Sequence, residues 1–264
     1  MDFTIILIAV LIVAGIGLII GLILSFASAV MAVPTDEKVE ALTEALPGAN
    51  CGACGYSGCS GYAAALASGE AKNGLCAPGG EECAKEIARI LGQEVGNLEK
   101  KVAVVRCMGI TDNTEDKVNY QGVKSCKGAM IVGSKGQCEF GCLGLGDCVA
   151  ACPYGAVSVC NGVARIDKDL CKACGLCVSA CPKKIIDIVP LKEQVIVRCS
   201  NTQKGALAKK ACKVACIGCK KCEKVCEKGA VSIEKFKATV DPYKCGGCSE
   251  CIEACPQGSI TNLF

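Results

Sequence analysis

The chain has 264 residues, of which 26 are cysteine and none is histidine or tryptophan. So much cysteine is typical of short secreted disulfide scaffolds, but this chain is too long and, at 51% hydrophobic, too apolar for that class to be the default. The absence of histidine excludes mixed Cys–His zinc sites, His-ligated haem and Ser–His or Cys–His catalytic pairs. A net charge of +3 is too small to indicate nucleic-acid binding. Disulfides, zinc held by four thiolates and iron–sulfur clusters remain.

The N-terminal segment carries no charge from Phe3 to Val33. As a helix these residues would extend roughly 46 Å, whereas a bilayer's hydrocarbon core is about 30 Å thick. We therefore expect residues 1–33 to be a single-pass transmembrane anchor. A cleaved signal peptide is the alternative, because Ala27-Ser28-Ala29 resembles a cleavage site, but no Lys or Arg precedes the unusually long apolar run.

Two glycines inside this segment, Gly17 and Gly21, form a GxxxG pair. Such a pair allows a second membrane helix to approach closely. The other interpretation is that glycine is simply common in membrane helices.

The first cysteine group lies in an expected domain over residues 34–100. Its spacing is C-x2-C-x4-C-x16-C, and we expect a short helix over 60–68 with Gly69 at its C-cap. A structural zinc site would instead favour two C-x2-4-C knuckles. We therefore expect one [4Fe-4S] cluster on Cys51, Cys54, Cys59 and Cys76.

Four further cysteine motifs follow a connecting segment over residues 101–136 that contains Cys107 and Cys126. Two have the spacing C-x2-C-x2-C-x3-C-P, a third has Glu227 in place of the proline, and a fourth, beginning at Cys138, is looser. Three closely spaced cysteines can present three thiolates to one cluster, and the fourth cysteine of the motif ligates the other cluster in two-cluster ferredoxins. We therefore expect two ferredoxin-like units, over residues 137–190 and 191–264.

This crossover rule predicts four more clusters. The expected ligand sets are Cys138/Cys142/Cys148/Cys181, Cys171/Cys174/Cys177/Cys152, Cys216/Cys219/Cys222/Cys255 and Cys245/Cys248/Cys251/Cys226. The first set is irregular, because Leu145 stands where the second unit has Cys219.

The two units are an internal repeat. Cys138-x3-Cys142-x5-Cys148-x3-Cys152 matches the segment from Cys212 to Cys226, and residues 104–107 match residues 196–199. We expect β-hairpins pairing 157–159 with 163–166 and 231–233 with 238–240. The clusters themselves would fill much of the interior, which would explain the scarcity of large aromatic side chains.

Six cysteines remain outside these five sets: Cys83, Cys107, Cys126, Cys160, Cys199 and Cys212. Cys107, Cys126, Cys199 and Cys212 are candidates for one additional cluster per repeat or for alternative ligands. The other interpretation is that they are small buried apolar residues. The expected number of [4Fe-4S] clusters is therefore five, or six to seven with additional ligands.

A basic stretch runs from Lys204 to Lys224, with seven lysines and one acidic residue, Glu223. One hypothesis is that it binds an acidic soluble ferredoxin near Cys216–Cys222. The other is that it is a solvated surface whose charge offsets that of the clusters.

With these motifs in place, the whole chain resembles the B subunit family of the Rnf complex, a membrane-bound, ion-translocating ferredoxin:NAD oxidoreductase. The most specific match is PGANCGACGYSGC over residues 47–59, and two ferredoxin-like pairs correspond to the longer type in the family. The resemblance implies a subunit that accepts electrons from reduced ferredoxin at the cytoplasmic face of the cell membrane. It would pass them to partner subunits with flavin and NAD sites, coupled to Na⁺ or H⁺ translocation.

The resulting expectation is an α+β protein with one transmembrane helix, a small four-cysteine domain and two tandem ferredoxin-like units. We expect no NAD or flavin site on this chain, because neither a strand-linked GxGxxG nor a P-loop is present. Alternatives from other classes are a secreted disulfide-rich binding protein and a multi-zinc scaffold. Within the redox class, the alternative is an anchored polyferredoxin serving another reductase or hydrogenase.

Overall fold

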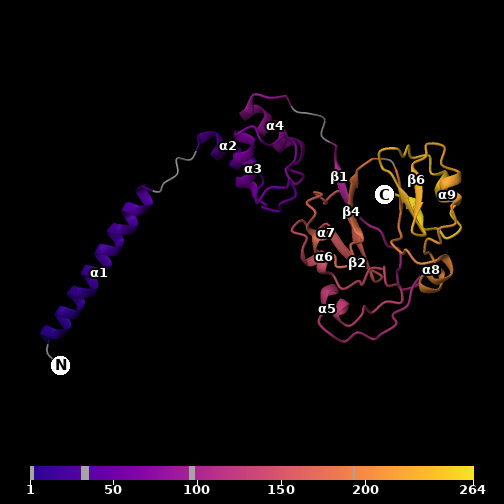
Figure 1. The fold of residues 1–264 in the computed structure, drawn as a ribbon, viewed down its shortest axis with the longest axis horizontal. Helices are drawn as coiled ribbons and strands as arrows, with labels where there is room; N and C mark the ends of the chain where they lie inside the picture. Colours follow the sequence, from indigo (N-terminus) through magenta and orange to yellow (C-terminus); the bar gives the residue numbers. More distant parts are fainter. Residues whose placement is uncertain (1–2, 31–35, 95–98, 193) are drawn as a thin grey trace.

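The computed structural model describes residues 3–30, 36–94, 99–192 and 194–264 (Figure 1). Within these residues the chain forms ten helices and eight strands, so the expected mixture of helix and strand is confirmed. All strands are short and pair only two by two, in antiparallel fashion.

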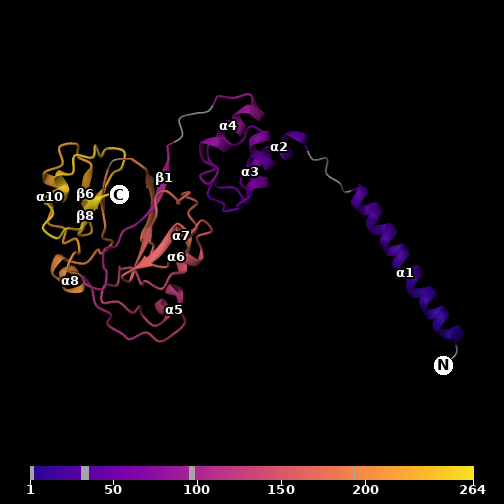
Figure 2. The ribbon, with the colours of Figure 1, turned by 180° about the vertical axis from the view of Figure 1, so that it is seen from behind.

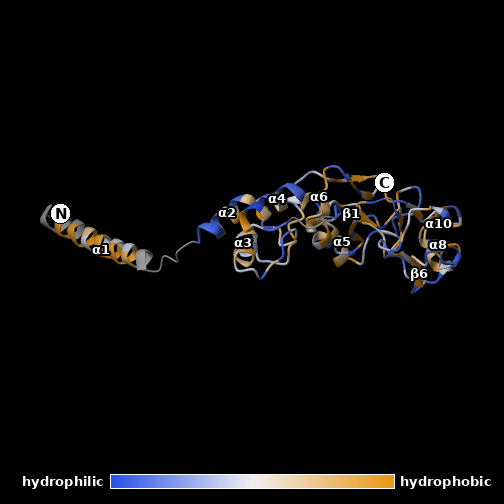
Figure 3. Cartoon of the chain, turned by 90° about the horizontal axis from the view of Figure 1, so that it is seen from above, coloured by the Kyte–Doolittle hydropathy of each residue, from blue (hydrophilic) through white to orange (hydrophobic). Residues whose placement is uncertain are grey.

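Helix α1 runs from Phe3 to Val30 and contains no charged residue. Its large apolar side chains in the described part, such as Leu11 and Phe26, are exposed (Figure 3). Over the described residues, no helix combines the length and the hydropathy of a membrane span. The expected end of the apolar segment at Val33 lies outside the described residues.

Helices α2 (Glu37–Ala45), α3 (Cys59–Ala67) and α4 (Gly80–Leu91) form the small first domain. Leu42, Tyr62 and Ile87 are fully buried where the three helices pack together. Helix α3 begins and ends one residue earlier than expected, with Ser68 as its C-cap and Gly69 following at a φ of +78°. A glycine in this left-handed conformation is a common helix terminator, because it lacks a Cβ.

Both expected hairpins are confirmed, with slightly longer strands. β2 (Val157–Cys160) pairs with β3 (Val163–Ile166), and β6 (Val231–Glu234) pairs with β7 (Lys237–Val240). The short helices beside them carry the third cysteine of each motif. These helices are α6 (Asp147–Ala150), α7 (Leu176–Ala180), α9 (Lys221–Lys224) and α10 (Glu250–Glu253).

Each unit also contains a second strand pair, which the sequence analysis did not anticipate. β1 (Lys101–Val105) pairs with β4 (Ile186–Pro190), and β5 (Val195–Val197) pairs with β8 (Ile260–Asn262). The segment expected to be a connection, 101–136, therefore begins with a strand of the first unit. The same segment contains α5 (Cys126–Ile131), and α8 (Gly205–Ala211) occupies the corresponding region of the second unit.

The core of each unit consists of small aliphatic side chains and cysteines. In the first unit Val105, Val163 and Ile186 pack with Cys107, Cys148 and Cys177. In the second unit the buried core contains the following residues: Val195, Val197, Cys199, Val231, Cys222, Cys251 and Ile260. This composition agrees with the scarcity of aromatic side chains in the sequence.

The two units lie side by side in the ribbon (Figure 2). Val102, Val104, Ile196 and Leu263 form a buried cluster between them. The guanidinium of Arg198 crosses this interface and donates hydrogen bonds to the carbonyls of Val105, at 3.3 Å, and Leu263, at 2.7 Å.

Candidate metal centres

All 26 cysteines lie in the described residues, and none of them forms a disulfide. They are distributed over both units and the first domain, and most are buried or half-buried. No group of three or more Cys, Asp or Glu side chains in the described part of the chain closes around a single metal ion.

Two cavities in the second unit are lined by the two ligand sets expected there. Cys216, Cys219, Cys222 and Cys255 line one cavity, beside β7 and β8. Cys226, Cys245, Cys248 and Cys251 line the other, beside β5 and β6. Each cavity thus receives three cysteines from one motif and the fourth from the other, which is the crossover that the spacing predicts.

In the first unit, one cavity is lined by Cys142, Cys148 and Cys181, but the fourth cysteine on it is Cys126 and not Cys138. This is a correction to the expected set. Leu145 stands where the second unit has Cys219, so the motif lacks its middle thiol. Helix α5, which precedes the motif in the chain, presents Cys126 instead.

The carboxylate of Asp147 binds the N-terminus of α5. Its Oδ1 accepts a hydrogen bond from the Cys126 N–H at 2.8 Å, and its Oδ2 accepts from the Lys127 N–H at 3.0 Å and the Ser125 hydroxyl at 3.1 Å. Partial burial opposes ionisation of Asp147, but these hydrogen bonds outweigh it and lower its pKa below the usual value. Asp147 directly precedes Cys148, so one short segment positions two cysteines of this site.

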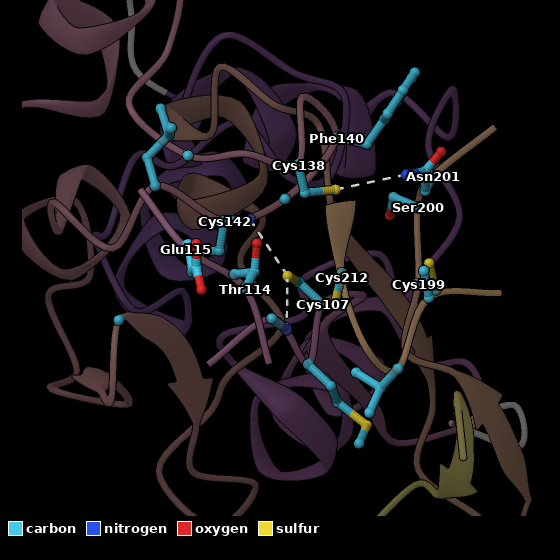
Figure 4. A pocket seen from close by; sticks show the side chains of 18 of the residues that line it. Cys107, Thr114, Glu115, Cys138, Phe140, Cys142, Cys199, Ser200, Asn201 and Cys212 are labelled. Atoms are coloured by element: carbon cyan, nitrogen blue, oxygen red, sulfur yellow. Dashed lines mark hydrogen bonds between the residues drawn. The ribbon is translucent and has the colours of Figure 1, made fainter. Parts of the chain in front are cut away.

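Cys138 lies on a different cavity, of about 240 Å³, together with Cys107, Cys199 and Cys212 (Figure 4). Three of these four cysteines were among those left outside the five expected sets. The cavity lies between the two units, because Cys107 and Cys138 belong to the first unit and Cys199 and Cys212 to the second.

The remaining set of the first unit is brought together as expected. Cys152 and Cys171 pack beside Cys177. Burial, together with the nearby sulfurs of Cys171, Cys174 and Cys152, raises the pKa of the Cys177 thiol to about 11. The sulfur of Cys171 accepts hydrogen bonds from the N–H groups of Ala103 and Ala173, each at 3.4 Å.

In the first domain, Cys54, Cys59 and Cys76 lie around the buried core of the three helices. The Cys59 N–H donates a 2.8 Å hydrogen bond to Asn50 Oδ1, which fixes the loop that carries these cysteines. Cys51 lies at the edge of this group, near Tyr154: burial raises the pKa of Tyr154, and the proximity of Cys174 and Cys51 adds to the shift.

A fifth thiol, Cys83, lies against Cys76, and its spacing from the other cysteines did not predict this contact. A side-chain hydrogen bond between the two thiols lowers the pKa of Cys76 to about 6 and raises that of Cys83. Cys83 is buried in α4, seven residues after Cys76, and its lone position in the sequence gave no spacing signal.

Backbone N–H groups point at several of the cysteine sulfurs, at equivalent places in the two units. The Ala164 N–H donates to Cys142 Sγ at 3.5 Å, and the Ala238 N–H donates to Cys216 Sγ at 3.4 Å. Hydrogen bonds of this kind favour the thiolate over the thiol and are typical of iron–sulfur ligands.

Burial has the opposite effect on these sulfurs. It raises the pKa of Cys148 to about 12 and those of Cys222 and Cys251 to about 11. A cationic metal core deprotonates a coordinating thiol outright and would make these clustered sulfurs thiolates. The sulfurs that line common cavities, with their N–H donors, therefore fit iron–sulfur clusters.

Three protein-family models match the chain at these sites. The family described as "Putative Fe-S cluster" matches residues 46–78, the "4Fe-4S binding domain" matches 164–187, and the "4Fe-4S dicluster domain" matches 215–259. Iron–sulfur domains of the four-iron type are thus present in the two units, and an iron–sulfur domain in the first domain.

Known proteins similar to this chain include three B subunits of ion-translocating complexes. The B subunit of the Na⁺-translocating ferredoxin:NAD⁺ oxidoreductase complex of Acetobacterium woodii is 42% identical over 87% of this chain and 69% of its own length. The B subunit of the ion-translocating oxidoreductase complex of Methanosarcina acetivorans is 40% identical over 90% of both chains. The B subunit of the proton-translocating ferredoxin:NAD⁺ oxidoreductase complex of Clostridium ljungdahlii is 38% identical over 87% of this chain and 82% of its own. On this identity, extent and set of iron–sulfur domains, the chain belongs to the family of B subunits of Rnf-type ion-translocating oxidoreductase complexes.

Proposed function

We propose that this chain accepts electrons from reduced soluble ferredoxin and relays them towards flavin- and NAD-binding subunits of a membrane-bound complex. The complex would couple this transfer to the translocation of Na⁺ or H⁺. The observation that carries the proposal is the crossed set of four cysteines on each cavity of the second unit. Two of the relatives are subunits of ferredoxin:NAD⁺ oxidoreductase complexes, which supports the proposed donor and acceptor.

Five sets of four cysteines would hold the clusters in this function. They are Cys51/Cys54/Cys59/Cys76, Cys126/Cys142/Cys148/Cys181, Cys171/Cys174/Cys177/Cys152, Cys216/Cys219/Cys222/Cys255 and Cys245/Cys248/Cys251/Cys226. When bound, such clusters exchange single electrons at potentials set by hydrogen bonds to sulfur and by solvent exposure. The chain's own contribution is therefore the placement of thiolates and of the N–H groups that donate to them.

We propose that α1 anchors the chain in the cell membrane, with the cysteine domains on the cytoplasmic side. Its uncharged sequence and its exposed apolar side chains support this assignment. Expressed without its partner subunits, a variant that begins with Met followed by residue 36 should leave the membrane fraction while keeping its iron, whereas its retention in membranes under these conditions would exclude the anchor.

The exposed edge of the second unit is the proposed docking site for ferredoxin. Cys219 and Cys248 are exposed, while the other cysteines of their two sites are buried or half-buried. Lys220 and Lys221 follow Cys219 directly and are exposed as well. A positive surface at an exposed cluster ligand favours encounter with an acidic protein.

Charge reversal tests this docking site in the full complex. Lys220→Glu/Lys221→Glu should slow reduction by ferredoxin and flatten its dependence on ionic strength, because the attraction between opposite charges is lost. The control, Lys117→Glu/Lys124→Glu, makes the same change in net charge at exposed lysines of the first unit. Equal rates in both variants and the wild type would remove this docking site.

The broader proposal is tested by purification through a tag on the full-length chain. We expect flavoprotein and multispan membrane subunits to copurify, with NAD⁺ reduction driven by reduced ferredoxin. Copurification of a hydrogenase or a different reductase, without that activity, would instead support the anchored polyferredoxin.

A further inference from the structure

We propose that Cys107, Cys138, Cys199 and Cys212 hold a sixth [4Fe-4S] cluster, shared between the two ferredoxin-like units. All four line the cavity of about 240 Å³ at the junction of the units. Figure 4 shows their side chains around one space, with the Cys107 and Cys212 sulfurs next to each other and Cys138 and Cys199 on the sides.

The internal repeat explains why this site needs both units. In the first repeat, β1 is followed by Arg106 and then Cys107. In the second repeat, β5 is followed by Arg198 and then Cys199. Cys138 and Cys212 each precede the first cysteine of the adjacent site by four residues. Each repeat therefore supplies the same two thiols, and four thiols come together only when the two repeats pack against each other.

The sulfurs of the site receive hydrogen bonds in the same pattern from both units. The Cys142 N–H donates to Cys107 Sγ at 3.3 Å, and the equivalent Cys216 N–H donates to Cys199 Sγ at 3.3 Å. The Gly109 N–H adds a second hydrogen bond to Cys107 Sγ, at 3.4 Å. Repeated N–H donors to sulfur are what a thiolate ligand requires.

A buried amide serves another sulfur of the site. Asn201 is fully buried, and its Nδ2 lies 3.7 Å from Cys138 Sγ in hydrogen-bonding geometry. Its Oδ1 accepts from the Gln203 N–H at 2.7 Å, which fixes the orientation of the amide. A buried polar side chain that is held towards a sulfur indicates a polar, charged site more than a merely apolar core.

The alternative is that these cysteines are small apolar core residues, and exposures of 7% for Cys107, 9% for Cys199 and 8% for Cys212 are compatible with it. Yet the four thiols, their N–H donors and Asn201 all converge on a cavity. A packed core instead minimises voids and buried polar groups.

The location of the site gives it a role. Cys142 belongs to the site of the first unit, and Cys216 to a site of the second, and both donate their N–H groups to sulfurs of the shared site. A one-electron carrier here would connect the two units, so that an electron leaving one unit's site reaches the other unit through it. This role rests on the proposed function, whereas the presence of the cluster does not.

Iron counting tests the site on the full-length chain, with clusters reconstituted under anaerobic conditions. Four irons per cluster predict about 24 irons and about 24 acid-labile sulfides per chain, against about 20 for five sites. Cys199→Ser/Cys212→Ser should lower the count by about four irons. Cys160→Ser, which removes an exposed thiol outside every site, should leave it unchanged.

The sharper readout is non-additivity. Cys107→Ser/Cys138→Ser should also remove about four irons, and the quadruple variant should lose no more than either pair, because both pairs hold one cluster. A loss of about eight irons in the quadruple variant would instead indicate one cluster per repeat and overturn the shared site. A count of about 20 in the wild type, or one zinc per chain that disappears in the variants, would overturn the cluster itself.

A second variant guards against loss through misfolding. Asn201→Ala keeps all four thiols, so the iron count should stay at about 24. Loss of its hydrogen bond to Cys138 should lower the midpoint potential of one component in an EPR-monitored redox titration, because such hydrogen bonds stabilise the reduced state. An unchanged titration would mean that no redox centre lies beside Asn201. Neither readout depends on ferredoxin or on partner subunits, so the sixth site and the proposed function can fail separately.

Discussion

The carboxylate of Asp147 accepts a 2.8 Å hydrogen bond from the backbone N–H of Cys126, twenty-one residues earlier in the chain. This contact ties α5 to the first unit's motif and brings Cys126 to the position that Leu145 cannot serve. Cys126 therefore lines the same cavity as Cys142, Cys148 and Cys181, although it lies outside their spacing motif.

Asp147→Asn tests this contact. The amide keeps the shape but presents an NH₂ group to one of the N–H donors, so we expect a loss of about 1–3 kcal/mol in the free energy of unfolding. Chemical unfolding of the reconstituted full-length chain measures it. If the loss were within a few tenths of a kcal/mol, the contact would not hold α5.

The same contact predicts a pH dependence. The folded-state pKa of Asp147 is lowered, so its contribution to stability is fully present above the unfolded value of about 3.9. That contribution is lost as the pH falls through the lower, folded-state pKa. The stability difference between the wild type and Asp147→Asn should therefore be constant near neutral pH and shrink below about pH 4.

Cys126→Ser tests the corrected ligand set. If Cys126 is a ligand of the first unit's site, the variant should lose between one and four irons per chain, since an incomplete set can keep a three-iron remnant or none. Cys160→Ser is the control, because it removes an exposed cysteine that lies outside every site and should leave the iron count unchanged. If Cys126→Ser kept a full iron count while Cys148→Ser lost iron, Cys126 would not be a ligand of this site, and another residue would be its fourth ligand.

The grouping of the second unit's cysteines could be predicted from the sequence, because cysteines in one loop have a fixed spacing. The sets on Cys216–Cys222 and Cys245–Cys251, with their crossed fourth cysteines, line single cavities as the motif required. The hairpins were also predictable, because they pair strands of alternating residues that lie close together in the sequence. The turn is Asn161-Gly162 in the first hairpin and Lys235-Phe236 in the second.

Long-range contacts were not predictable from the motif. β1 pairs with β4, which lies about eighty residues later in the chain. The sequence of a five-residue strand does not indicate which distant strand it pairs with. Cys126, Cys107, Cys199 and Cys212 were candidates for additional or alternative ligands, but the spacing could not say which cysteines they would join. Cys126 lies on the cavity of Cys142, Cys148 and Cys181, and the other three lie with Cys138 on the cavity between the units, because contacts between distant segments decide these places.

Arg198→Met tests the interface between the two units. The methionine keeps most of the apolar stem but leaves the carbonyls of Val105 and Leu263 without their donor. Unsatisfied buried carbonyls predict a loss of about 2–4 kcal/mol in the free energy of unfolding. Arg89→Met, which breaks an exposed ion pair with Glu86, should cost less than about 1 kcal/mol. Equal losses in the two variants would mean that Arg198 does not hold the units together.

Gly218→Ala tests the close packing of a cluster-binding loop against its hairpin. Gly218 has a φ of +65°, and a Cβ placed there would lie 2.8 Å from the carbonyl oxygen of Phe236 in the hairpin β6–β7. The equivalent Gly144 faces the carbonyl of Gly162 in the same way, so both units use a glycine where the loop after the first cysteine meets the hairpin turn. Gly229→Ala is the control: its φ of +57° imposes a similar conformational strain, but a Cβ there would meet no atom within 4 Å.

We expect Gly229→Ala to lose about 1 kcal/mol from backbone strain alone, and Gly218→Ala to lose about 1–3 kcal/mol more, because the loop must shift away from the hairpin. The shift would also displace Cys219, the next residue and a ligand, so Gly218→Ala should release iron faster than Gly229→Ala when a chelator is added. Indistinguishable unfolding midpoints and iron-release rates for the two variants would show that the loop accommodates a Cβ, and that its approach to the hairpin does not position the ligands.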